Sequence, residues 1–185
     1  SIGNLGATSD NIKSEKIFRN IFFGNFWLMA FCTAMLFTLI TPFITLWAGT
    51  DYLLDDYVVL AIIFNFYILG MRKSVIQFKT ALGLFWYDRF RPFIEAIVGV
   101  GLMILLGYYL GLVGIFLGNI INYFVVTFWI EPIVLYKHGF KMKPIRFYLT
   151  YLQYFVITCL IAAISYFSTS FIKEINVGAL LLTAL

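Results

Sequence analysis

The amino-acid sequence contains no charged residue between Arg19 and Asp51, and this run constrains the fold more than any other feature. A helix needs about 20 mostly apolar residues to cross the hydrocarbon core of a bilayer. The segment FWLMAFCTAMLFTLI within the run does not alternate between apolar and polar residues, as strands of a membrane barrel do. Hydrophobic residues make up 62% of the chain, whereas soluble domains have roughly 45–50% apolar residues. The sequence therefore predicts an integral membrane protein built from helices.

Further apolar stretches follow the first one, so the predicted fold class is all-α, a polytopic transmembrane bundle of about five or six helices. The chain starts at Ser1 and ends within the apolar run GALLLTAL. We therefore expect one transmembrane module, residues 1–185, that is a fragment of a longer protein. The predicted helices cover about residues 21–46, 57–82, 92–109, 112–136 and 147–167, with a partial helix at 177–185.

The connections between the predicted helices alternate in charge. The segment before the first helix, the connection 71–92 and the loop 137–146 are rich in Lys and Arg, whereas the loop AGTDYLLDD has three Asp and no base. Lys and Arg in short loops tend to stay in the cytoplasm. The pattern therefore predicts that the basic connections and the N-terminal end of the chain are cytoplasmic.

The second predicted helix carries basic residues beyond Gly70. At 100° per residue, Arg72 and Lys79 fall on one line of this helix, and Arg72 lies about 22 Å from Tyr57. That depth is within a hydrocarbon core of about 30 Å, where ionisable side chains usually face the bundle interior or an aqueous cavity. We call the basic residues beyond Gly70, with Gln77 beside them, the basic stripe. It predicts that this helix forms the basic side of a cavity that binds an anionic substrate. The candidate substrate-binding residues are Arg72, Lys73, Lys79, Gln77 and Asn65.

Two of these assignments have an alternative. If the helix ended near Gly70, the basic residues would instead contact anionic lipid head groups at the membrane interface. Asn65 lies deeper and could instead form a hydrogen bond between helices.

The stretch GLFWYDRFRPFIEA brings several charges together. We interpret Asp88, Arg89 and Arg91 as a cytoplasmic turn, after which Pro92 and Glu95 begin a helix. For Glu131 we expect an ion pair with a neighbouring Lys or Arg. The spacing Gly114-x-x-x-Gly118 would allow close contact between helices.

Motifs of catalysis and metal binding are absent from the sequence. It contains no His-x-x-x-His pair, nucleophile elbow or phosphate loop, and Cys32 and Cys159 have no metal ligand at a suitable spacing. We therefore expect no enzyme, no metal and no cofactor, and His138 is interpreted as a solvated loop residue. No basic run alternates with aromatic residues as in nucleic-acid binding proteins, so no nucleic-acid partner is expected.

Several short motifs follow one another in a recognisable order: SIGNL, NFWLMAFC, TPFITLW, NFYILGMRKSVIQF, GLFWYDRFRPFIEA, LGLVGIFLGNIINY and FWIEPIVLYK. Together they resemble the C-terminal part of bacterial polysaccharide repeat-unit flippases. These form a branch of the multidrug/oligosaccharidyl-lipid/polysaccharide exporter superfamily. The resemblance extends to about Phe147.

The resemblance implies a transporter with two lobes of six helices around a central cavity, often with two extra C-terminal helices. Most of the N-terminal lobe's half of that cavity would be missing from this chain. It implies that undecaprenyl-diphosphate-linked oligosaccharides cross the bacterial cytoplasmic membrane by alternating access, for capsule, O-antigen or exopolysaccharide synthesis. The basic stripe would bind the diphosphate. The implied partners are this substrate, membrane lipid and the missing N-terminal half. We expect no acidic residue deep in these helices, so that an ion-coupling site would lie in the missing half.

Three other functions stay open from the sequence. One is another exporter of the same superfamily, for drugs or a peptidoglycan precursor. Another is a membrane enzyme of polysaccharide assembly, although a polymerase is expected to have a large polar extracellular loop, and AGTDYLLDD is short and acidic. The last is a structural fragment with no activity of its own.

Overall fold

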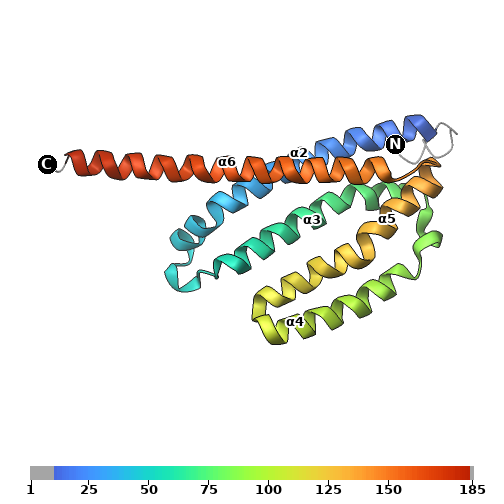
Figure 1. Ribbon diagram of the computed structural model, residues 1–185, viewed down its shortest axis with the longest axis horizontal. Helices are drawn as coiled ribbons and strands as arrows, with labels where there is room; N and C mark the ends of the chain where they lie inside the picture. The colour runs from blue at the N-terminus through green and yellow to red at the C-terminus, as the bar shows by residue number, and fades with distance from the viewer. Residues whose placement is uncertain (1–10, 184–185) are drawn as a thin grey trace.

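The computed structural model describes residues 11–183, with side chains described for residues 11–169, and every regular element in this part of the chain is helical. Long helices run back and forth along one axis (Figure 1). Four spans of the described residues are long and apolar enough to cross a membrane: Asn11–Trp47, Asp56–Ala81, Arg91–Phe140 and Ile145–Thr169. The predicted all-α transmembrane bundle is therefore confirmed.

The main helices are α2 (Asn11–Trp47), α3 (Asp56–Ala81), α4 (Arg91–Asn122), α5 (Phe128–Val134) and α6 (Ile145–Thr183). Short 3-10 turns, η1 (Thr50–Tyr52) and η2 (Leu84–Asp88), follow α2 and α3. Two π-helical turns, η3 (Tyr123–Thr127) and η4 (Leu135–Phe140), flank α5.

The span Arg91–Phe140 folds back on itself at Gly111, so α4 and its continuation form two antiparallel legs (Figure 1). Gly111 has φ 61° and ψ −139°, a conformation that is open to glycine but strained for other residues. A Cβ atom on Gly114 would lie 1.9 Å from the carbonyl oxygen of Leu106, and one on Gly118 would lie 2.9 Å from the backbone nitrogen of Met103. The two backbones therefore touch at the two glycines for which the sequence predicts close helix contact.

The chain connections gather at two opposite ends of the bundle. The segments 82–90 and 141–144 lie at the same end as the start of α2, whereas 48–55 and the turn of the α4 hairpin lie toward the other end (Figure 1). The first end holds the basic connections and the second holds the acidic loop. The zigzag path inferred from the charges is therefore present in the described part of the chain.

Helix boundaries differ from the prediction at both ends of the chain. The first helix begins at Asn11 instead of near residue 21, because residues 11–20 also favour a helix, with Glu15 and Arg19 3.8 Å apart at a spacing of four. Instead of two helices at 147–167 and 177–185, a single helix α6 continues to Thr183, since no Pro or Gly interrupts residues 168–177. Residues 184–185 lie outside the described part.

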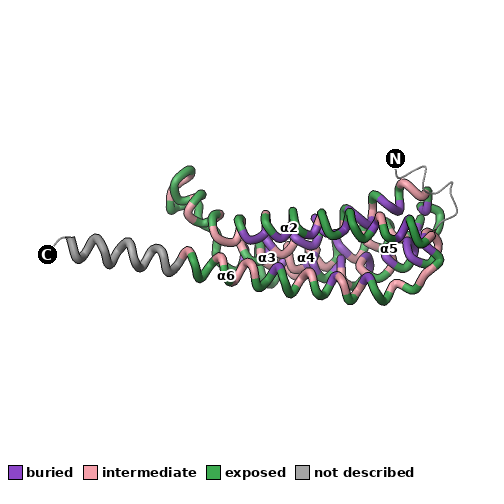
Figure 2. The backbone as a smooth tube through the Cα atoms, turned by 90° about the horizontal axis from the view of Figure 1, so that it is seen from above, coloured by how far each residue is buried: buried purple, intermediate pink, exposed green. Residues whose placement is uncertain are grey.

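The interior is richest in aromatic side chains near the basic end. Phe18 of α2 is 1% exposed, and its ring centroid lies 5.1 Å from that of Phe78 on α3 and 5.6 Å from that of Phe140. Buried residues gather where α2, α3 and α5 face each other, and exposed residues cover the outer faces (Figure 2). The exposed residues include large apolar ones such as Trp27 and Phe31, as expected of surfaces that contact lipid tails.

Candidate functional site

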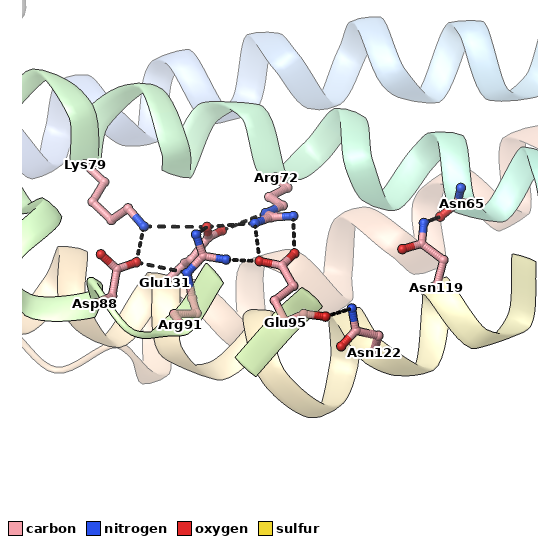
Figure 3. A network of polar contacts seen from close by, with 9 residues as sticks. All are labelled: Asn65, Arg72, Lys79, Asp88, Arg91, Glu95, Asn119, Asn122 and Glu131. Carbon is pink, nitrogen blue, oxygen red and sulfur yellow. Dashed lines mark hydrogen bonds and ion pairs between the residues drawn. The ribbon is translucent and has the colours of Figure 1, made fainter. Parts of the chain in front are cut away.

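Six charged side chains from α3, η2, α4 and α5 form one connected cluster, which we call the charge network (Figure 3). It joins three bases to three carboxylates, so its formal charge is zero at neutral pH. Its members are Arg72, Lys79, Asp88, Arg91, Glu95 and Glu131.

Glu131 of α5 lies at the centre of the network and is 1% exposed. Arg72 donates to it from Nε and Nη2, each at 3.0 Å from one carboxylate oxygen. Arg91 Nη2 and Lys79 Nζ lie 3.1 and 3.5 Å from Oε1 of the same carboxylate. The expected ion pair of Glu131 is thus confirmed, and it involves all three bases of the network.

Asp88 and Glu95, the other two carboxylates, also bind the three bases. Asp88 accepts hydrogen bonds from Lys79 Nζ and, at 3.0 Å, from Arg91 Nε. Glu95 accepts from Arg72 at 2.9 and 3.3 Å and also from Arg91. Every base in the network therefore contacts at least two carboxylates, which offsets part of the cost of removing these charges from water.

The local sequence explains how these side chains meet. Arg72 and Lys79 are seven residues apart, about two turns, so they lie on one line of α3. Gly83, with φ 68°, ends that helix and lets η2 turn back beneath it. Asp88 then closes η2, and Arg91 and Glu95 occupy successive turns at the start of α4 at a spacing that favours ion pairs.

The network is closed on one side and open on the other. The side chains of Lys79, Asp88 and Glu131 are 2–4% exposed, whereas those of Arg72 and Glu95 are 15% and 23% exposed. Their contacts at 2.9 Å and 3.3 Å thus form the accessible edge of the network. Arg72 also lies over the ring of Tyr123, at 6.0 Å from its centroid, where the aromatic face adds attraction for the cation.

Asparagine side chains continue the polar contacts away from this edge. Asn119 donates to the Asn65 side-chain oxygen at 2.9 Å, which joins α4 to α3. Asn122 donates to the backbone carbonyl of Glu95 at 3.1 Å, which joins the two legs of the α4 hairpin (Figure 3). Asn65 thus makes the hydrogen bond between helices that the sequence left as its alternative.

In the structure, the polar and basic residues predicted as one stripe on α3 lie on two different faces of the helix. The helix passes Gly70 without interruption, and Arg72 and Lys79 point into the bundle. Lys73 and Gln77 are exposed and lie outside the network. At 100° per residue they are about 100° and 140° away from Arg72 around the helix, which is enough to place them on another face.

Four members of the network are not among the candidate site residues predicted from the sequence. Asp88 and Arg91, interpreted only as part of a turn, lie within the network, with Asp88 7% exposed and the Arg91 side chain 10% exposed. Glu95 is interpreted from the sequence as part of a helix start, and Glu131 is expected only to form an ion pair. The signal that could have located these residues was the near balance of Asp and Glu with Lys and Arg in the sequence around α3, α4 and α5, because buried charges must be paired.

Comparison with known proteins gives no match: no protein-family model, no curated protein and no solved structure is significantly similar to this chain. The chemistry of the site therefore rests on the charge network itself. The planar guanidinium of Arg72 donates paired hydrogen bonds to both Glu95 and Glu131, and phosphate oxygens can accept the same paired hydrogen bonds. At the accessible edge, the N–H groups that an anion would meet on Arg72 are those that now donate to Glu95.

Proposed function

We propose that this chain is part of a transporter that carries undecaprenyl-diphosphate-linked oligosaccharides across the bacterial cytoplasmic membrane by alternating access. The observation that carries the proposal is the accessible Arg72–Glu95 edge of a charge network inside an apolar helix bundle. Ionisable residues inside membrane proteins commonly mark the pathway of a substrate or an ion. The order of sequence motifs that resembles polysaccharide flippases supports the same function.

In this proposal the substrate diphosphate competes with Glu95 for the two arginines. Glu95 contacts both Arg72 and Arg91 and is the most exposed carboxylate of the network. Phosphate oxygens accept paired hydrogen bonds from guanidinium in the same geometry as a carboxylate. An incoming diphosphate would therefore take the place of the Glu95 carboxylate while Glu131 continues to hold Arg72.

The same competition provides a means of release. A transporter must bind its substrate in one conformation and release it in another, so the affinity must differ between the two. The network joins residues of α3, η2, α4 and α5, and a shift among these elements changes the distance from Glu95 to Arg72. Return of Glu95 to the arginines would expel the diphosphate. In this proposal the basic end faces the cytoplasm, as the positive-inside rule predicts.

The experiment that tests the function compares two basic residues of one helix. Cells whose own gene is replaced by the Arg72→Gln variant are expected to lose most surface polysaccharide and to accumulate lipid-linked repeat units. The matched Lys73→Gln variant, which removes an exposed base next to it, is expected to export normally. Membrane abundance is measured by immunoblot for both variants. Normal export by Arg72→Gln at normal abundance would contradict the proposal.

A further inference from the structure

A second group of aromatic and basic side chains, separate from the charge network, lies at the basic end of the bundle. The turn η2 and Phe90, two residues after its end, present exposed aromatic rings, which are 54–73% accessible. Exposed bases of the neighbouring segment 137–146 lie beside them. We call this group the aromatic–basic end; its residues are Phe85, Trp86, Tyr87, Arg89, Phe90, Lys137, Lys141, Lys143 and Arg146.

The outward direction of these rings is fixed by buried residues of the same turn. Leu84 and Asp88 are each 7% exposed, and Asp88 is paired with Lys79 inside the network. A Cβ atom on Gly139 would lie 3.1 Å from the Leu84 side chain, so η2 rests directly on η4. With its first and last residues held inside, the turn has its middle residues, Phe85 to Tyr87, on the surface.

Arg89 is the focus of the aromatic–basic end. Its guanidinium carbon lies 3.9 Å from the ring centroid of Trp86 and 4.8 Å from that of Phe90. No ion pair between described side chains involves Arg89, although the residue is exposed. Rings on the guanidinium face hold it in place by cation–π attraction and leave its N–H groups available to an anion.

The two segments of this surface are also linked to each other. The rings of Tyr87 and His138 are stacked, with centroids 3.8 Å apart and planes 13° apart. This contact fixes η2 against the segment that carries Lys137, Lys141 and Lys143. The surface is thus one joined platform made from two connections of the chain.

The charges at this end that are not in ion pairs between described side chains are positive. The described carboxylates near it are Glu15, Asp88, Glu95 and Glu131, and each is in an ion pair. The bases of the segment 137–146 are exposed, and none of them belongs to an ion pair between described side chains. At the opposite end, Asp51, Asp55 and Asp56 are exposed. Among the described side chains, those exposed at the aromatic–basic end therefore attract an anionic surface.

We propose that the aromatic–basic end binds the anionic head groups of phospholipids in the adjacent leaflet, with Arg89 as the principal phosphate ligand. Trp and Tyr side chains prefer the level of the head groups, and each Lys or Arg near an anionic membrane surface adds about 1 kcal/mol, or about fivefold in affinity. The proposal does not depend on the transport function, because Arg89 lies outside the charge network.

The test measures phosphatidylglycerol binding to the purified full-length protein by native mass spectrometry, with phosphatidylcholine as the reference lipid. The wild type is expected to prefer phosphatidylglycerol, and this preference should become weaker at high salt. Arg89→Gln should lower its affinity about fivefold, and Arg89→Gln with Lys143→Gln about 25-fold. Trp86→Ala should weaken binding and Trp86→Phe should restore it, because Phe keeps a ring against Arg89; Trp86 is 73% exposed, so neither change disturbs the core.

Two controls test where the lipid binds and whether the bound anion is a lipid head group or a free diphosphate. Lys73→Gln removes an exposed base about two turns before the end of α3 and should leave phosphatidylglycerol binding unchanged. Inorganic pyrophosphate should not displace the lipid. Equal losses in Lys73→Gln and Arg89→Gln, or no loss in the Arg89→Gln/Lys143→Gln variant, would overturn the proposal. Displacement by pyrophosphate would also overturn it and would assign the surface to a diphosphate ligand.

Discussion

Arg72 and Glu131 form a two-point ion pair, in which Nε and Nη2 of the arginine donate to the two carboxylate oxygens at 3.0 Å each. The pair joins α3 to α5 across 59 residues of sequence. Glu131 also contacts Lys79 and Arg91, so a single buried carboxylate holds three bases of two other helices. Glu131 therefore links α5 to both α3 and α4.

Replacement of that carboxylate should therefore strongly destabilise the fold. Glu131→Gln leaves three bases with only two carboxylates, and breaking a buried ion pair from one side costs about 3–5 kcal/mol. We expect a loss of this size in the free energy of unfolding, measured by denaturant titration of the purified protein in detergent. Arg72→Met combined with Glu131→Gln restores the charge balance, so the double variant should be less destabilised than the sum of the single variants. Additive effects would show that the two residues are not coupled.

The glycines of the α4 hairpin give a prediction about packing alone. In Gly114→Ala the added Cβ atom would lie 1.9 Å from the carbonyl oxygen of Leu106. The two legs of the hairpin must therefore move apart. We expect a loss of about 1–3 kcal/mol in stability, as for an overpacked core. Gly101→Ala is the matched control in the same hairpin, because a Cβ atom there has no neighbour within 4 Å. A Gly114→Ala protein as stable as the Gly101→Ala protein would contradict the observed close contact.

The sequence predicts the framework of the fold well and the site only in part. Length and hydropathy locate the apolar helices, and Gly114 and Gly118 identify the close contact, because these signals depend on neighbouring residues along one helix. The charge network joins Arg72 to Glu95 and Glu131 over 23 and 59 residues. Such pairing depends on how the helices rotate relative to one another, which the pattern of a single helix does not specify.

The separation of Lys73 from Arg72 illustrates the same limit. Both residues are basic and adjacent, and both are predicted from the sequence to bind the substrate. Only the packing of α4 and α5 against that helix decides that Arg72 points inward while Lys73 is exposed. The predicted gap between helices 147–167 and 177–185 is absent for another reason. Polar residues in this segment suggest a break, but neither Pro nor Gly occurs at 168–177 to stop the helix.

Orientation in the membrane is predicted from the charges of the connections. In a variant without Cys32 and Cys159, Asp51→Cys should react with a membrane-impermeant maleimide in intact cells, because the acidic loop is expected outside. Lys143→Cys should react only after the membrane is permeabilised. Labelling is read by a mass shift on a gel. The reverse pattern would show that the basic end faces outward.

The central claim is that Glu95 and a diphosphate compete for Arg72 and Arg91, and the most direct measurement is the affinity of the purified full-length protein for undecaprenyl diphosphate. Glu95→Gln removes the competing charge at the open edge of the network, so it should tighten binding by about tenfold, whereas Arg72→Gln should weaken it by at least as much. Lys73→Gln should bind as the wild type does. Unchanged or weaker binding by Glu95→Gln, with Arg72→Gln equal to the wild type, would contradict the account.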